Sequence, residues 1–321
     1  MDNCVLYDWV SITSKIHSPQ NLIDLLGFND PAIVWEQVKG AKGYQDRLYW
    51  GSISIHYNGR EDMGIWLEMS GQGCRNFETY GSGDYDSLFR EVFDNPNEMN
   101  VTRLDVAFDD HTGILDQAII CDDSRNHEFI SRFRQVDVHY STGGDSVTFG
   151  DRSSDLLIRI YDKAAERGYT DGRHWVRVEL QLRRERAFDF LRRGGDLGET
   201  FRGVLHNYLR YVDDPVSDDL NRWRWPMKSY WENLLQGVGK IQIFTNPGAE
   251  YNLYNLENFL FTQTAGAAFT YMQLKGPDDF IQRVKKSVVR LNPKYKDLID
   301  FYGSKGYNIP TMPESVGYIN A

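Results

Sequence analysis

The sequence of 321 residues has little cysteine and no long apolar run. Its three cysteines, Cys4, Cys74 and Cys121, show no CxxC spacing, which argues against both a disulfide framework and a structural zinc site. No apolar run approaches the ~18 residues that a membrane-spanning helix needs. The first ten residues, MDNCVLYDWV, lack the basic start and apolar core of a signal peptide. We therefore expect a cytoplasmic protein with no membrane partner.

Positive charge is also scarce, because the formal net charge is −10. Taken alone, that charge disfavours a partner as anionic as nucleic acid. The cations are clustered, however, within residues 183–193, 222–224 and 283–296, while the acidic excess lies elsewhere. An acidic protein can therefore still present basic surfaces to DNA. For any single cluster, a solvated helix face is the simpler interpretation.

What the sequence does contain, over its first 205 residues, is a series of alternating segments. The pattern predicts a hairpin in LYWGSISIHYNGREDMGIWLEMSG, with Asn58 and Gly59 at the turn. Further strands are predicted in VTRLDVAFDD, DSVTFGDR, LLIRIYDK and HWVRVELQLR, and helices in QNLIDLLGF and YDSLFREVFD. Since strands and helices do not alternate regularly, we expect an α+β fold with a largely antiparallel central sheet and helices on one side.

The later part of the chain is dominated by helical spacing of its apolar residues. Such spacing occurs in RAFDFLRRGG, ETFRGVLHNYLRYV, SYWENLLQGVG, NLENFLFTQTAGAAFTYMQLKG and DDFIQRVKKSVVRLN. The change of pattern predicts one domain over residues 1–205 and a mostly helical region over residues 206–321.

One predicted strand carries a tyrosine between two cations. In LLIRIYDK the apolar side chains occupy one face, and Arg159, Tyr161 and Lys163 occupy the other. Neighbouring cations favour the phenolate form and would hold an anionic group close to it. This placement raises the hypothesis that Tyr161 is a nucleophile.

The same period of two residues places acids and cations of other strands on a shared polar face. The predicted set is Glu68, Arg103, Asp105, Arg159, Tyr161, Lys163, Arg177 and Glu179. Carboxylates suit Mg²⁺ or Mn²⁺, and the cations suit phosphate. A metal that polarises a phosphodiester with a tyrosine in line describes a nicking transesterase. From alternation alone, the solvent face of an amphipathic sheet, with Arg159 paired to Glu179 across strands, is the favoured interpretation.

Four motifs occur in a fixed order: GQGCRNFE (71–78), VTRLDVAFDD (101–110), RIYDK (159–163) and WVRVELQLR (175–183). With an early YDWVSIT and a later WRWPMKSYWENLL, they resemble the trans-acting replication initiation factors of rolling-circle plasmids and phages. That family also contains relaxases of some integrative conjugative elements. The resemblance spans residues 5–240, so the end of the chain lies outside it.

The resemblance implies a sequence-specific nickase that joins a tyrosine to a 5′ phosphate and frees a 3′ hydroxyl as primer. By motif position the nucleophile is Tyr161. The metal ligands are Asp105 and Glu179, with Glu68 as a weaker third candidate for Mg²⁺ or Mn²⁺. The implied roles at the phosphate, or at the departing 3′ oxygen, belong to Arg159, Lys163 and Arg177. The implied partners are an origin hairpin or single strand, a host helicase and a second copy of the chain.

Histidine pairs separated by one residue, which bind metal in many nicking initiators, are missing from this sequence. The family that the chain resembles relies on carboxylates instead. His56 is a possible additional ligand on the face that carries Glu68, although an ordinary half-exposed histidine is the simpler interpretation.

Further basic residues are assigned to DNA binding. In QRVKKSVVRLNPKYK, helical spacing of Val284, Val288 and Leu291 predicts an amphipathic helix whose cations follow duplex phosphates. The residues assigned to DNA are Arg183, Arg184, Lys285, Lys286 and Arg290. Residues 1–205 are accordingly expected to form the nickase domain and residues 206–321 an accessory DNA-binding region. For Trp223, Trp225 and Trp231, packing against the sheet is favoured over base stacking.

Three alternatives stay open at this point. One is a conjugative relaxase with the same chemistry. Another is a metal-dependent hydrolytic endonuclease, in which Tyr161 only positions a phosphate. The third is a DNA-binding protein without catalysis, whose cations and tryptophans hold single strands by charge and stacking.

Overall fold

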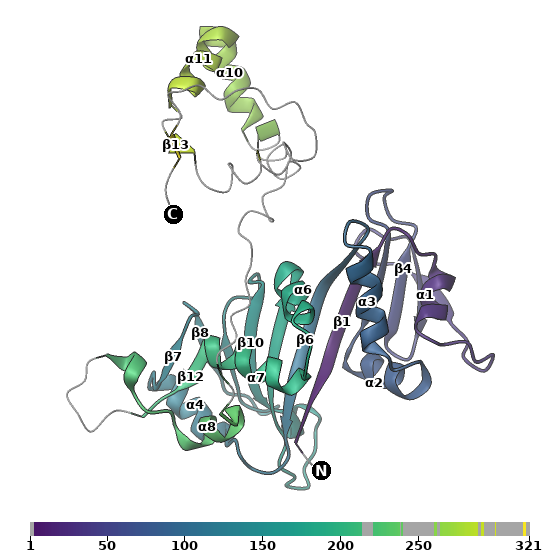
Figure 1. Ribbon diagram of the computed structural model, residues 1–321, viewed down its shortest axis with the longest axis vertical. Helices are drawn as coiled ribbons and strands as arrows, with labels where there is room; N and C mark the ends of the chain where they lie inside the picture. The colour runs from purple at the N-terminus through teal and green to yellow at the C-terminus, as the bar shows by residue number, and fades with distance from the viewer. Residues whose placement is uncertain are drawn as a thin grey trace. The chain divides into compact units, whose positions relative to one another are not determined.

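The chain forms two compact units, Met1–Phe244 and Thr245–Ala321. The structure, a computed structural model, describes residues 3–213, 221–237, 239, 260–261, 264–287, 290–291, 299 and 317–318 (Figure 1). The boundary expected at residue 205 falls inside helix α7 (Leu197–Tyr208), so the first unit extends beyond the predicted domain.

The first unit is built on a ten-stranded sheet in the order β2-β3-β4-β5-β1-β6-β11-β10-β9-β8. Every neighbouring pair in it is antiparallel. The strands are β1 (Cys4–Ser14), β2 (Glu36–Lys39), β3 (Asp46–Trp50), β4 (Ile53–Tyr57), β5 (Ile65–Met69), β6 (Met99–Asp110), β8 (Val136–His139), β9 (Ser146–Phe149), β10 (Leu156–Asp162) and β11 (Val176–Arg183). The predicted α+β fold with a largely antiparallel sheet is confirmed.

Helices cover one face of this sheet, and α1, α2, α3, α6 and α7 lie on that face in Figure 1. Besides α7, the helices of the unit are α1 (Pro19–Leu25), α2 (Gly71–Tyr80), α3 (Tyr85–Asp94), α4 (Gln117–Arg125), α5 (Lys163–Glu166), α6 (Arg184–Arg192) and α8 (Ser229–Leu235). Side chains cap several of their first turns, as when the Asp84 carboxylate accepts from the Ser87 amide. These caps explain why the helices begin where they do.

The hydrophobic core lies between these helices and the apolar side of the strands. Leu104, Val106 and Phe108 of β6 face it, as do Val178 and Leu180 of β11. Because side chains alternate along a strand, the residues between them point to the opposite, polar face. The predicted division of these strands into an apolar and a polar face is confirmed.

Several local predictions need correction. LYWGSISIHY is two strands, β3 and β4, because Gly51 and Ser52 turn between them with positive φ. The segment LRY of ETFRGVLHNYLRYV is strand β12 (Leu209–Tyr211), which pairs with β7 (Phe129–Ser131). Helical spacing misled here because both faces of this short segment contact protein.

The tryptophans of WRWPMKSYW have different environments. Trp231 of α8 is fully buried in the core, in agreement with the packing that was favoured for it. Trp223, in the short 3-10 helix η1 (Arg222–Arg224), is more than half exposed. Its packing prediction is therefore wrong, because this turn stands on the surface of the unit.

The second unit contains α10 (Ala265–Lys275), α11 (Pro277–Ser287) and the short parallel pair β13 (Arg290–Leu291) and β14 (Gly317–Tyr318). The basic helix therefore ends at Ser287, and Arg290 lies in a strand instead of on that helix. Val288 lies outside the described residues. None of the helices in the described part of the chain combines the length and apolar character needed to cross a membrane.

Candidate active site

Three adjacent strands near the centre of the sheet, β6, β11 and β10, bring the predicted site residues together. Their register places Asp105 opposite Gln181, Glu179 opposite Arg159, and Arg177 opposite Tyr161. All of these side chains belong to the polar face of the sheet, and all are buried except Arg159.

Tyr161 is paired with a carboxylate. Its hydroxyl donates a hydrogen bond to Glu179 Oε2 at 3.0 Å, and only 4% of the residue is exposed. Burial and the neighbouring Glu179 charge raise the pKa of Tyr161 well above its usual value. The expectation that nearby cations favour the phenolate is therefore wrong for this arrangement. Tyr161 carries its proton, and Glu179 is the group placed to accept it.

Two cations flank the phenol, as the alternation predicted. The Lys163 ammonium lies 3.5 Å from the Tyr161 hydroxyl and 2.5 Å from Glu166 of the following turn. The Arg159 guanidinium lies over the Tyr161 ring, 4.7 Å from its centroid, and 3.9 Å from Glu179. Lys163 is buried, whereas the Arg159 side chain is 41% exposed. Arg159 is therefore the cation of this pair that a phosphate can reach first.

Asp105 and Glu179 form a buried pair of carboxylates on neighbouring strands. Burial raises the pKa of both, and the charge of Asp105 contributes to raising the pKa of Glu179 to about 7. Asp105 accepts two hydrogen bonds from Arg103, at 2.9 and 2.5 Å, and one from Gln181 at 3.4 Å. For both carboxyls burial is the largest cause of the raised pKa, and the charges of Arg103 and Arg159 offset it only in part.

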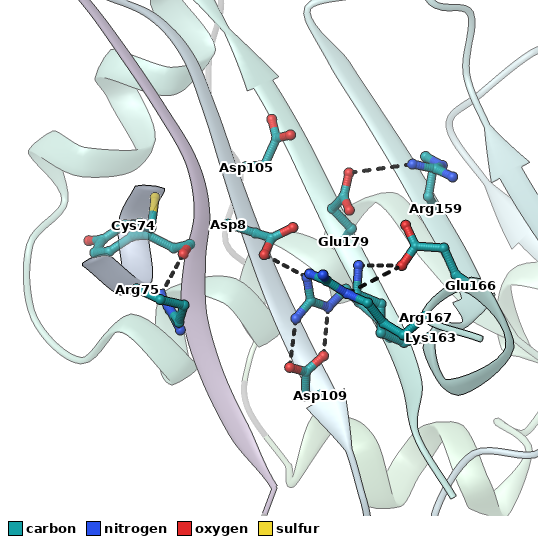
Figure 2. A network of polar contacts seen from close by, with 12 residues as sticks. Asp8, Cys74, Arg75, Asp105, Asp109, Arg159, Lys163, Glu166, Arg167 and Glu179 are labelled. Atoms are coloured by element: carbon teal, nitrogen blue, oxygen red, sulfur yellow. Dashed lines mark hydrogen bonds and ion pairs between the residues drawn. The ribbon is translucent and has the colours of Figure 1, made fainter. Parts of the chain in front are cut away.

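Arg177 is held by two acids, Asp8 and Asp109, that were not predicted to belong to the site. Its guanidinium donates to both oxygens of Asp109, at 2.6 and 2.7 Å, and lies 2.6 Å from Asp8. Figure 2 shows Asp8, Asp109, Asp105 and Glu179 around the same stretch of sheet. Because Arg177 is buried between two carboxylates, it serves first to hold these acids in place.

An irregularity in β1 brings Asp8 to this face. The pairing of β1 with β6 shifts between Tyr7 and Trp9, so Asp8 is an extra residue in the strand. Gly71, the first residue of α2 and of the motif GQGCRNFE, lies beside it: a Cβ on Gly71 would stand 2.7 Å from the Asp8 carboxylate. The motif YDWVSIT contains Asp8, but simple alternation gives no sign of the bulge.

Glu68 and His56 lie on the polar face but do not join the carboxylate pair. In the register of the sheet, Glu68 of β5 lies opposite Ser11 of β1, and Ser11 in turn lies opposite Arg103 of β6. The Glu68 carboxylate lies 3.9 Å from the Lys42 ammonium. His56 is buried and stacked on Trp66 with ring centroids 4.5 Å apart. Burial, with Arg47 and Lys42 nearby, lowers the pKa of His56 to about 4. The expectation of a half-exposed histidine is therefore wrong.

The oxygen donors at Asp105 and Glu179 fit a hard divalent cation. Among the described residues no cluster of three or more His, Cys, Asp or Glu side chains is placed to share a metal ion. Two carboxylates match Mg²⁺ or Mn²⁺, which keep several waters and take further oxygens from substrate phosphate. Glu68 is not brought to this pair.

The residues assigned to DNA are spread over both units. Arg183 ends β11 and donates to Gln181 at 3.0 Å, while Arg184 begins α6 with positive φ and lies 3.3 Å from Asp155. Lys285 and Lys286 are exposed on the last turn of α11. Arg290 lies in β13, so its expected place on the same helix is corrected.

Two grooves lie on the polar face of the sheet. The first crosses β8 to β11 and is lined by Gln135, Asp137, His139, Ser146, Thr148, Gly150, Asp151, Arg152, Leu157, Arg159, Gln181 and Arg183. The second crosses β1, β5 and β6 and is lined by Trp9, Ser11, Thr13, Lys42, Tyr44, Trp66, Glu68, Thr102, Arg103 and Arg183. Arg183 lines both grooves, whereas Asp105, Glu179 and Tyr161 line neither.

Comparisons with known protein sequences identify the family of the chain. The family model described as "Replication initiation factor" matches residues 99–283, more than half of the chain, and "Rolling Circle replication initiation protein N-terminal domain" matches residues 4–93. A protein of Bacillus subtilis (strain 168) called "Putative DNA relaxase NicK" is 25% identical over 320 residues, covering 92% of this chain and 89% of its own.

A solved structure has the same fold. The rolling circle replication initiator protein from Geobacillus stearothermophilus is 30% identical, with a TM-score of 0.66, over 76% of this chain and 100% of that one. The fold and the family matches together place the chain in the class of rolling-circle replication initiators and relaxases. The chain belongs to the replication initiation factor family.

Proposed function

We propose that this protein starts rolling-circle DNA replication by cutting one strand at an origin through Tyr161, with help from a divalent metal. The observation that carries the proposal is the hydrogen bond from the Tyr161 hydroxyl to Glu179, 3.0 Å long, beside the second buried acid Asp105. A nucleophile, a base that orients it and an adjacent carboxylate are the groups that such a transfer needs.

The transfer exchanges one phosphoester bond for another. Tyr161 Oη attacks the phosphorus, and its proton passes to Glu179. The bond from phosphorus to the 3′ oxygen breaks, which leaves the 5′ phosphate on the tyrosine and a 3′ hydroxyl once that oxygen takes a proton. Lys163, with its ammonium 3.5 Å from the hydroxyl, stabilises negative charge that develops there. Arg159 receives the phosphate, because it is exposed and covers the Tyr161 ring.

A metal would be held by Asp105 and Glu179. When bound, Mg²⁺ or Mn²⁺ supplies a Lewis acid that polarises a phosphoryl oxygen. A bound divalent cation would offset the negative charge of these two carboxylates in the folded chain, so Mn²⁺ should raise the melting temperature without any DNA. Asp105→Asn and Glu179→Gln should each remove the Mn²⁺-dependent increase, whereas Glu68→Gln should keep it.

The cutting reaction is tested by trapping the protein on DNA. The full-length chain is mixed with Mn²⁺ and a single-stranded oligonucleotide library, and products are separated on a denaturing gel and mapped by mass spectrometry. We expect an adduct on Tyr161 that is absent in Tyr161→Phe and in the presence of chelator. Tyr208→Phe, which removes a phenol elsewhere in the unit, serves as the control and should form the adduct normally.

The other outcomes point to other functions. Cleavage without an adduct, persisting in Tyr161→Phe, would identify a hydrolytic endonuclease. Binding without cleavage on both single strands and hairpins would identify a passive DNA-binding protein. The relative called a DNA relaxase supports a second use of the same chemistry, transfer of a conjugative element, and an adduct that forms on a transfer origin but not on a replication origin would favour it.

The second unit is proposed to hold DNA through the last turn of α11. Lys285 and Lys286 are exposed there, and removing one cation that binds a phosphate should lower the slope of log affinity against log salt by about 1. We expect Lys285→Ala with Lys286→Ala to lower the slope, measured by fluorescence anisotropy on duplex DNA. Asp278→Asn on the first turn of the same helix serves as the control, and an unchanged slope in the double variant would refute the assignment.

A further inference from the structure

The second groove of the polar face is lined by residues of β1, β5 and β6. It combines an aromatic wall with a carboxylate and an ammonium group. Its wall is Trp66, whose indole N–H donates to Ser11 and whose inner face stacks on His56 at 4.5 Å. Thr102 donates to the same serine at 2.9 Å. The pairing of β1 with β6 shifts at this point, so Thr102 is an extra residue that widens the floor. The wall is therefore fixed in place before any ligand arrives.

Trp66 is buried, and its ring has three neighbours: the rings of His56 and Tyr44, the latter with its centroid 6.2 Å away, and the Lys42 ammonium. Of these three, Lys42 is the flexible and mostly exposed side chain. The Lys42 ammonium lies 4.3 Å from the ring centroid, and its side chain is 72% exposed. A planar ring with a polar edge can take the place of this ammonium, because stacking on tryptophan is favourable for every nucleic acid base. Trp9 and its stacked Arg103, 4.2 Å from the ring, border the same groove.

A carboxylate, Glu68, and an ammonium, Lys42, lie side by side in this groove. Glu68 and Lys42 are 3.9 Å apart, and burial of Glu68 is only partial. A carboxylate accepts two parallel hydrogen bonds, and an ammonium donates to a carbonyl. The pairing edge of guanine presents two adjacent donors followed by a carbonyl, which complements this order. Adenine and cytosine present one donor next to an acceptor, and thymine presents a single donor between two carbonyls.

We propose that this groove binds one unpaired guanine of the target strand, stacked on Trp66 and read by Glu68 and Lys42. The inference rests on the proposed function only in taking a DNA strand as the substrate. Arg103 links the groove to the carboxylate pair, because it borders the groove and donates to Asp105. A guanine held here fixes which phosphate lies over Tyr161, so the groove contributes to the choice of cutting site.

The test measures binding and needs no cleavage. The Tyr161→Phe protein selects ligands from a library of randomised single strands, and the selected strand is then scanned with abasic sites. We expect one guanine whose removal weakens binding roughly tenfold, in line with the loss of one stacked base. Inosine at that position, which lacks the exocyclic amine, should weaken binding less. In Tyr161→Phe with Glu68→Gln, the preference for guanine over adenine at that position should fall to about twofold or less.

A matched variant separates base recognition from the general effect of charge. Glu61→Gln removes one acid from the exposed loop between β4 and β5 and should keep the guanine preference. Lys42→Ala should reduce the preference without abolishing binding. The proposal is overturned if the library yields no preferred strand, or if Glu68→Gln discriminates bases at every position as its parent does. If the protein keeps its guanine preference but does not cut DNA, the proposed nickase function is refuted and the guanine site is still supported.

Discussion

At the scale of single residues, the ionisable side chains at the centre of the sheet are buried, and the role of each depends on the partners that it contacts. Arg177 was expected at the scissile phosphate, but it lies between Asp8 and Asp109. Tyr161 was expected to be held as an anion, but burial beside Glu179 keeps its proton on. In both cases alternation along one strand identified the residue. Its burial and its partners on other strands could not be read from that strand alone.

Replacement of Arg177 should destabilise the fold strongly. Arg177→Met leaves the buried Asp109 and the partly buried Asp8 without their cation, and breaking a buried ion pair in this way costs about 3–5 kcal/mol. Urea unfolding followed by circular dichroism measures the loss. Arg159→Met is the control, since Arg159 is 41% exposed and its pair with Glu179 is 3.9 Å long. Equal stability of the two variants would contradict the role assigned to Arg177.

Glu179 should make both stability and cutting depend on pH near neutrality. Its pKa, raised by burial and by Asp105, is about 7 in the folded chain against an ordinary 4.5. Between these values the folded state binds more protons than the unfolded one, so the free energy of unfolding falls as pH rises from 4.5 to 7. The slope from this group is at most about 1.4 kcal/mol per pH unit.

The comparison with Glu179→Gln isolates this effect. Without divalent metal, the variant should lack that part of the decline with pH, as measured by urea unfolding at a series of pH values. In the native chain adduct formation should increase through pH 7, because only the ionised Glu179 accepts a proton from Tyr161. A stability difference between the two proteins that stays constant from pH 4.5 to 7 would contradict the raised pKa.

At the scale of elements, the site depends on a bulge in β1 and on the start of α2. The bulge turns Asp8 towards Arg177, and Gly71 leaves the room that the Asp8 carboxylate occupies. Strand alternation predicted β10, β11 and the part of β6 that follows Thr102, with their polar faces, because these segments keep a period of two residues. A bulge interrupts that period, so Asp8 was missed although its motif was noticed.

Gly71→Ala tests the contact between these elements. Alanine is normally the better helix residue by about 0.5–1 kcal/mol. Here its Cβ would meet the Asp8 carboxylate at 2.7 Å, so we expect a net destabilisation of about 1–3 kcal/mol and slower adduct formation. Gln72→Ala, at the next and exposed position of α2, should leave both properties unchanged. A gain of stability in Gly71→Ala would show that Asp8 moves aside freely.

At the scale of the whole molecule, the class of the fold could be predicted, but the full sheet and the extent of the first unit could not. Local patterns indicated β3 to β6 and β9 to β11 and gave the α+β class, whereas β1, β2 and β8 were not predicted. The packing of α8 against the sheet is a contact between distant segments, and spacing of its apolar residues cannot say which surface covers them. The boundary was therefore placed at residue 205, before the segment that carries Tyr211 and Trp231 to the core.

Truncation distinguishes these two boundaries. A chain ending at residue 205 loses β12 and α8, and with them the fully buried Tyr211 and Trp231. Loss of one such aromatic side chain costs about 3–5 kcal/mol, comparable with the whole stability of many domains. We expect this chain to unfold without a cooperative transition, whereas a chain ending at residue 244 should melt cooperatively.

The longer truncation should also form the Tyr161 adduct on single strands, because the catalytic residues lie in the first unit. Duplex affinity should be lower than in the full chain if α11 holds DNA. Cooperative folding of the shorter chain would restore the boundary at residue 205.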